Sequence, residues 1–67
     1  MKTGQEVLQW VTAQSARWVN YTDVADALDL YPAVASSALR RLEAEDQLIV
    51  RKIEGAESSP WLEYRAP

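Results

Sequence analysis

Residues 32–53 read PAVASSALRRLEAEDQLIVRKI, and the spacing of apolar side chains changes partway along this stretch. Apolar residues first recur at helical intervals, which predicts a helix over residues 32–45. Residues 48–54 are then rich in β-branched side chains and predict a strand. The helix is expected to bury Ala35, Ala38, Leu39 and Leu42 and to leave Ala33, Ser36, Ser37, Arg40 and Ala44 on its opposite side. A helix that leads directly into a strand indicates a mixed α+β fold.

The predicted helix begins sharply at Pro32. The fixed φ of proline suits the first helical position, and the residue before a proline avoids helical angles. A shorter helix is expected over residues 22–29, ending near Leu30, so only a short turn separates the two. The small side chains of Ala35 and Ala38 allow these helices to cross closely. Two short helices joined by a tight turn predict a helix-turn-helix.

One more helix is predicted near the start of the chain, over residues 4–14. Thr3 and Glu6 have the spacing of a capping box, in which each side chain accepts a hydrogen bond from the backbone of the other residue. Thr22 is expected to cap the second helix. Asp23 then lies favourably at the positive end of that helix dipole.

A second strand is predicted over residues 61–65, after turn-forming residues at 55–60. With the strand before it, this makes a β-hairpin. Residues 18–20 have the β-branched and aromatic character of a further, very short strand. Asp46 and Gln47 must end the preceding helix without a glycine, although aspartate tolerates positive φ better than most residues.

These elements form one α+β domain over residues 1–67, with three helices and a C-terminal hairpin. Its core is predicted to contain Val7, Leu8, Val11, Val24, Leu28, Ala35, Ala38, Leu42, Leu48 and Leu62. Trp18 and Trp61 are also expected in the core, because both lie on strands. Trp10 flanks the apolar side of its helix, where it either fills the core or offers an exposed contact to a partner.

The composition excludes several functional classes. The chain has no cysteine and no histidine, which removes the commonest thiol nucleophile, the commonest general base and most transition-metal ligands. We therefore expect no enzyme activity, no cofactor and no metal. No apolar run is long enough to span a membrane, and the N-terminus lacks the apolar region of a signal peptide, so a cytoplasmic location is expected. The net charge of −3 is unusual for a protein that binds nucleic acid by general electrostatics.

The run VASSALRRLEAE at residues 34–45, followed by LIVR at residues 48–51, resembles the winged helix-turn-helix superfamily. The similarity covers roughly residues 5–65. It is greatest to transcription regulators of the MarR and ArsR kind and to small fimbrial regulators of the PapI kind. This resemblance implies a winged helix-turn-helix fold. It also implies that the third helix enters the DNA major groove while the hairpin, or wing, lies along the backbone or in the minor groove.

Three features depart from this family pattern. Asp46 and Gln47 stand where a glycine often precedes the first wing strand. Glu54 and Glu57 lie at the hairpin tip, where a wing that grips DNA would carry arginine or lysine. Residues 1–67 contain no counterpart of the helices that dimerise the larger regulators. We therefore expect the tip to stay off DNA and one copy to bind weakly, so that a homodimer or a larger protein partner supplies affinity.

Seven residues are candidates for contact with double-stranded DNA. They are Tyr31, Ser36, Ser37, Arg40, Arg41, Arg51 and Lys52. The guanidinium of Arg40 suits a bidentate contact to guanine, and Arg41, about 100° further round the helix, suits a phosphate. The alternative is that both arginines are solvated and that Arg41 pairs with Glu45 one turn further on.

The remaining candidates also have two interpretations each. Ser36 and Ser37 either let the helix approach a groove closely or form a neutral solvent face. Tyr31 either binds a phosphate at the helix N-terminus or packs against the turn. Arg51 and Lys52 either help concentrate positive potential on one surface, away from the three aspartates of the second helix, or belong to a mixed-charge surface.

Two functions follow from these alternatives. The first is sequence-specific DNA binding by a small transcription regulator, and the second is a protein-interaction module built on the same fold. The acidic balance and the acidic hairpin tip favour the second. A continuous positive surface over Ser37, Arg40, Arg41 and Lys52 would favour DNA, whereas an apolar patch around Trp10 would favour a protein partner.

Overall fold

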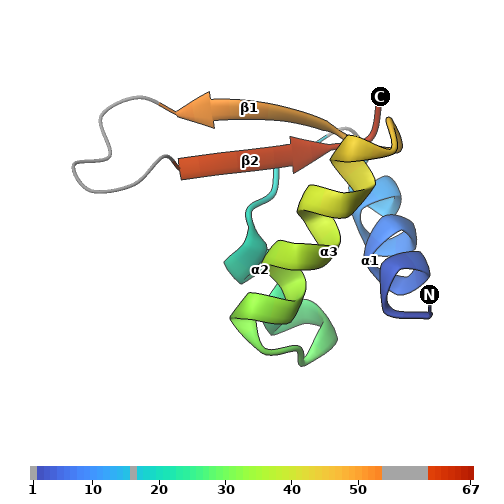
Figure 1. The fold of residues 1–67 in the computed structure, drawn as a ribbon, viewed down its shortest axis with the longest axis vertical. Coiled ribbons are helices and arrows are strands. Elements are labelled where there is room, and N and C mark those ends of the chain that lie inside the picture. Colours follow the sequence, from blue (N-terminus) through green and yellow to red (C-terminus); the bar gives the residue numbers. More distant parts are fainter. Residues whose placement is uncertain (1, 16, 54–60) are drawn as a thin grey trace.

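Three helices and two strands follow one another in the predicted order in a computed structural model, which describes residues 2–15, 17–53 and 61–67. The elements are α1 (Lys2–Ala13), α2 (Tyr21–Leu28), α3 (Pro32–Ala44), β1 (Ile49–Ile53) and β2 (Trp61–Arg65). Their ends differ from the predicted ones by at most two residues. The fold is therefore α+β, with three helices and one two-stranded antiparallel sheet, and its layout is compatible with a winged helix (Figure 1).

The start of α2 differs from the prediction. Asn20, not Thr22, is the N-cap, because its side-chain oxygen accepts a hydrogen bond from the backbone N–H of Asp23 at 2.9 Å. The carboxylate of Asp23 in turn accepts one from the N–H of Asn20 at 3.1 Å, which completes a capping box. The hydroxyl of Thr22 donates to the same oxygen of Asn20. The predicted box at Thr3 is also wrong, since α1 already includes that residue.

A tight turn joins α2 to α3, as the sequence predicts. Asp29 adopts a left-handed conformation, with φ of 54°, and ends α2. The N–H of Leu30 reaches back to the carbonyl of Ala25 at 2.9 Å. Tyr31 is then extended, and Pro32 is the first residue of α3. The stop and restart predicted around Leu30 and Pro32 are confirmed.

The end of α3 is formed without glycine. Asp46 has φ of 62°, and its N–H donates to the carbonyl of Glu43 at 3.0 Å. The N–H of Gln47 donates to the carbonyl of Leu42 at 2.9 Å. These two bonds are those of a Schellman motif, with aspartate in the position that glycine usually takes.

The sheet lies across one end of the helices, and β1 follows directly on the C-terminal end of α3 (Figure 1). In the β1–β2 pairing, Val50 lies opposite Tyr64 and Arg51 lies opposite Glu63. Val19 pairs with Tyr64 from the other side through hydrogen bonds of 2.9 and 2.7 Å. The extended segment predicted at residues 18–20 is thus confirmed at Val19, and β2 lies between two extended neighbours.

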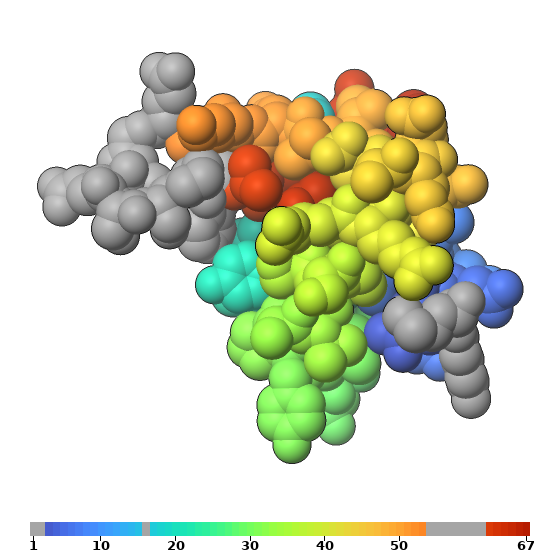
Figure 2. All heavy atoms as spheres, in the orientation of Figure 1, coloured from blue at the N-terminus to red at the C-terminus, as the bar shows by residue number. Residues whose placement is uncertain are grey.

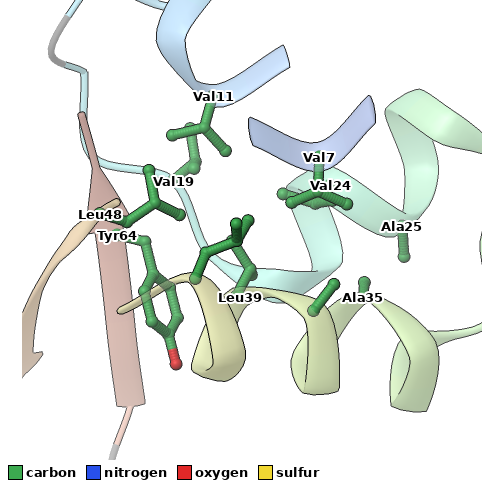
Figure 3. Close-up of a cluster of buried hydrophobic side chains, with 11 residues drawn as sticks. Val7, Val11, Val19, Val24, Ala25, Ala35, Leu39, Leu48 and Tyr64 are labelled. Carbon is green, nitrogen blue, oxygen red and sulfur yellow. The ribbon is translucent and has the colours of Figure 1, made fainter. Parts of the chain in front are cut away.

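One cluster of apolar side chains connects the helices to the sheet (Figure 3). Its buried members are Val7, Val11, Val19, Val24, Ala25, Ala35, Ala38, Leu39, Leu42, Leu48 and Tyr64. Seven of the ten predicted core residues are among them, and the other three, Leu8, Leu28 and Leu62, are half-buried and pack against the cluster. The ten omit Val19, Ala25, Leu39 and Tyr64, although the helical spacing of residues 32–45 does place Leu39 on the buried side. None of the described helices combines the length and the apolar character needed to cross a bilayer.

The tryptophans differ from one another. Trp10 is half-buried and packs against the core, as in the first of its two interpretations. Trp18 is half-buried as well. It precedes the buried Val19, so it lies on the side of the sheet that faces away from the helices, and its predicted place in the core is wrong. The side chain of Trp61, like Glu54 and Glu57, lies outside the described residues.

Candidate nucleic-acid interface

Four of the seven candidate residues lie on α3. Ser37, Arg40 and Arg41 are exposed, Ser36 is half-buried, and the buried residues lie on the opposite side of the helix. The predicted orientation of α3 is therefore confirmed. Figure 2 shows the solvent side of α3, in green to yellow, uncovered at the front of the molecule.

A groove runs between α3 and the sheet. It has a volume of about 650 Å³ and is lined by Ser37, Arg40, Arg41, Glu43, Val50, Leu62 and Tyr64. Residues opposite each other in a sheet share a side, so Lys52, opposite Leu62, lies on the same side of the sheet as Val50 and Tyr64. Lys52 thus lies on the side of the sheet that faces the groove. Arg40 and Arg41 line the same groove from α3.

Arg40 and Arg41 differ in how firmly they are engaged. The Nε atom of Arg41 lies 3.4 Å from the Glu45 carboxylate, and both side chains are more than half exposed. An exposed pair of this kind contributes only a few tenths of a kcal/mol, so a stronger anion can replace it. Arg40 forms no ion pair with any residue that the structure describes. Its guanidinium is the less constrained of the two.

Tyr64 and Glu43 shape the electrostatics of the groove. Burial raises the pKa of the Tyr64 hydroxyl above its ordinary value, Arg40 opposes this by lowering the pKa, and Glu43 raises it further. The phenol is therefore neutral at physiological pH and remains a hydrogen-bond donor. The carboxylate of Glu43 reduces the positive potential that Arg40 would otherwise produce on its own.

Tyr31 is the N-cap of α3 and immediately precedes its first residue, Pro32. Its side chain is 81% exposed, so it does not pack against the turn. The N-terminus of α3 offers few donors for an anion, because Pro32 has no N–H and the N–H groups of Val34 and Ala35 already bond to the carbonyl of Tyr31. Only the N–H of Ala33 has no partner among the described residues. A phosphate at this position would therefore depend on the Tyr31 hydroxyl more than on the helix terminus.

Arg51 lies apart from the other candidates. It occupies the outer side of the sheet, where its guanidinium carbon is 4.4 Å from the centre of the Trp18 ring. Its Nη2 and Nε atoms lie 2.6 and 2.8 Å from one carboxylate oxygen of Glu63. Arg65 also stacks on Trp18, at 5.0 Å, and its Nε atom is buried with no hydrogen-bond partner in the described part of the chain. These arginines hold the outer side of the sheet together.

Three residues that line the groove are not among the predicted contact residues: Val50, Tyr64 and Glu43. The alternation of the strand contained a usable signal for one of them, since Val50 precedes Lys52 by two positions and so shares its side of the sheet. Nothing in the sequence indicates that β2 places Tyr64 against α3.

The site offers hydrogen-bond donors and positive charge, but no metal-binding cluster. Among the described residues, no three carboxylates lie close enough together to hold a metal ion. Its available groups are the positive charges and N–H donors of Arg40, Arg41 and Lys52, which suit contact with an anionic or hydrogen-bonding surface. Comparison of the chain with family models, curated proteins and solved structures finds no match.

Proposed function

We propose that this chain is a winged helix-turn-helix domain that binds double-stranded DNA, with α3 in the major groove and the β1–β2 sheet as the wing beside it. The order of elements and the tight turn between α2 and α3 support the proposal. The observation that carries it is the solvent side of α3, where two adjacent arginines lie exposed on a helix whose opposite side is buried.

The side chains around Arg40 allow α3 to approach a groove of DNA closely. The major groove of B-DNA is wide enough for an α-helix, and Ala33, Ser37 and Ala44 keep this side of α3 narrow. Arg40 is free to make the bidentate contact to guanine. Arg41 exchanges its weak pair with Glu45 for a phosphate.

The wing contributes less than α3. Lys52 is exposed and shares the groove side of the sheet, so it contacts a phosphate beside the recognition helix. Arg51 lies on the outer side of the sheet, beside Trp18 and Glu63, so it makes no such contact. With few phosphates neutralised and a net charge of −3, one copy binds weakly and with a shallow salt dependence. A second copy on a neighbouring half-site, or a larger partner, supplies the remaining affinity.

The test begins with selection from random-sequence duplexes at low salt, followed by affinity measurements on the selected site and on a scrambled duplex. Arg40→Ala is expected to weaken binding to the selected site by about 1–3 kcal/mol and to relax the preference at one base pair. Arg41→Ala is expected to weaken binding to both duplexes similarly and to flatten the salt dependence of the affinity. If the double variant binds both duplexes as the parent does, α3 does not recognise DNA.

A protein-interaction module remains the second candidate, and one observation favours it. Tyr31, the N-cap of α3, and Val34, in its first turn, both have large exposed side chains, which is the kind of surface that protein partners bury. The exposed large apolar residues of the described chain do not include Trp10. Replacing Glu54 and Glu57 by glutamine separates the candidates, because DNA affinity should stay constant or rise, whereas a clear loss would favour the protein-interaction function.

A further inference from the structure

The outer edge of β1 has no neighbour in the described part of the chain. β2 pairs with Val19 on one side and with β1 on the other. Among residues 2–15, 17–53 and 61–67, β1 pairs with β2 alone. The sheet therefore has an open edge five residues long, Ile49–Ile53, and such an edge offers unpaired backbone groups to another strand.

The hydrogen bonds of Tyr64 determine which groups on β1 point outward. Tyr64 exchanges both of its backbone hydrogen bonds with Val19, so its N–H and carbonyl face away from β1. Val50, opposite Tyr64, is consequently in a non-hydrogen-bonded pair. Non-hydrogen-bonded pairs alternate with hydrogen-bonded ones along an antiparallel ladder. Lys52 is therefore also in a non-hydrogen-bonded pair, whereas the backbone of Arg51 forms hydrogen bonds with Glu63 of β2. The N–H and carbonyl groups of Val50 and Lys52 therefore point to the open edge.

The side chains of this edge are apolar or positively charged. Ile49 and Val50 are each 37% exposed, and Arg51 and Lys52 are exposed as well. β1 thus carries two positive charges and no carboxylate, in a chain whose net charge is −3. Trp18 and Glu63 fix the guanidinium of Arg51 from one side, which lowers the entropy lost when a ligand binds its exposed side.

We propose that β1 accepts an extended acidic segment of a partner protein as an additional antiparallel strand. Backbone hydrogen bonds to Val50 and Lys52 supply affinity, and the side chains opposite β1 supply specificity. Carboxylates of the partner lie opposite Lys52 and Arg51, and apolar side chains lie opposite Val50 and Ile49. The added strand runs antiparallel to β1, so its residues lie opposite Ile53, Lys52, Arg51, Val50 and Ile49 in turn. Its sequence is therefore Val-Glu-Glu-Val-Val, or one of the same chemical character.

A second copy of β1 is a poor occupant of the same edge. In the antiparallel register that overlaps all five residues, Arg51 of one copy lies directly opposite Arg51 of the other. Like charges directly opposite each other destabilise strand pairing. The same edge gains two opposite-charge pairs from an acidic segment. Charge complementarity therefore selects a partner over self-association.

The first experiment is amide hydrogen exchange of the full chain by NMR, alone and with a capped peptide containing Val-Glu-Glu-Val-Val. In the free protein, the amides of Val50 and Lys52 are expected to exchange rapidly and that of Arg51 slowly. The peptide should slow exchange at Val50 and Lys52, and a matched peptide with lysine in place of glutamate should not. No slowing, or slowing by both peptides alike, would overturn the proposal.

Variants test the same edge independently. Val50→Pro removes an outward N–H without removing a bond to β2, so affinity for the peptide should fall about tenfold. Val50→Thr keeps the N–H and should bind as the parent does. If Val50→Pro does not fold, Lys52→Glu replaces it, because it leaves the contacts of Arg51 with Trp18 and Glu63 in place. Lys52→Glu should shift the preference toward the lysine peptide, and an unchanged preference would contradict the inference.

Two other occupants are distinguishable outcomes. Slow exchange at Val50 and Lys52 in the free protein, together with sedimentation as a dimer that Val50→Pro abolishes, would assign the edge to a second copy. Slowing of the same two amides by duplex DNA, with displacement of the acidic peptide, would assign it to nucleic acid. Either result overturns the proposal. DNA binding by α3 survives the first result, so failure of the edge and failure of α3 are told apart.

Discussion

The solvent side of α3 and the outer side of the sheet each carry two arginines, but the arginines differ in what they contact. On the sheet, Arg51 and Arg65 stack on the same indole, and Arg51 also pairs with Glu63. On α3, Arg41 has one long, exposed pair, and Arg40 has none among the described residues. Equal charge therefore has unequal consequences, since Arg51 and Arg65 stabilise the fold through the Trp18 ring, whereas Arg40 and Arg41 make no such contact in the described part of the chain.

The same contrast applies to the two sides of α3. Its buried side contributes Leu39, which is fully buried, and Leu42, which is 6% exposed. Its solvent side contributes charge and short hydroxyls. We expect substitutions on the buried side to change stability and substitutions on the solvent side to change binding, and the predictions below test that division.

The largest effect is expected from the buried side. Leu39→Ala and Leu42→Ala should each lower the free energy of unfolding by about 2–5 kcal/mol, because a small domain cannot refill the cavity. Urea denaturation measures this, with Leu39→Met as a volume-conserving control that should cost less than about 1.5 kcal/mol. An alanine variant as stable as the parent would mean that α3 is rotated from the orientation described above.

A smaller loss of stability is expected from the outer side of the sheet. Trp18→Ala removes the ring on which two arginines stack, and we expect a loss of roughly 1–3 kcal/mol, within the usual range for single substitutions. Trp18→Phe keeps an aromatic face and should recover part of the loss. If thermal denaturation shows no difference between the alanine variant and the parent, the stacked arrangement does not stabilise the sheet.

The smallest effect concerns alkaline pH. The pKa of Tyr64 is raised above its usual value of 10.0, chiefly by burial. The unfolded chain therefore loses this proton at a lower pH than the folded chain. The resulting stabilisation is complete below about pH 10 and is lost as the pH rises through the higher pKa of the folded state.

Tyr64→Phe isolates this ionisation. Denaturation curves at neutral pH and at about pH 11 should show a smaller alkaline loss of stability for the phenylalanine variant than for the parent. Equal losses in the two proteins would mean that Tyr64 ionises as freely in the folded chain as in the unfolded one.

The helical part of this chain was largely predictable from sequence. Helical spacing of apolar residues located the buried side of α3, and Pro32 fixed its first residue. The N-cap of α2 was harder to predict, because two residues near its start can serve as a cap. Asn20 and Thr22 are both good caps, and the choice depends on which of them has an acidic residue three positions later, which is Asp23 for Asn20.

The arrangement of the sheet and of the site depends on which strands pair and in what register, and local sequence patterns do not reveal this pairing. The separation of Arg51 from Lys52 follows from strand alternation and was predictable once the strand was recognised. The stacking of Arg51 and Arg65 on Trp18 was not, because it requires that residues 18–20 pair with β2, far away in the sequence. The role of Tyr64 in core and groove depends on the same long-range pairing.

The most direct measurement compares two double variants that change charge equally. Arg40→Gln with Arg41→Gln alters α3, and Arg51→Gln with Arg65→Gln alters the outer side of the sheet. Affinity for the selected duplex is measured at low salt, below the melting temperature of each variant. The α3 variant should lose about tenfold or more in affinity, and the sheet variant should bind as the parent does despite a lower melting temperature. Equal losses, or a greater loss in the sheet variant, would contradict recognition of DNA by α3.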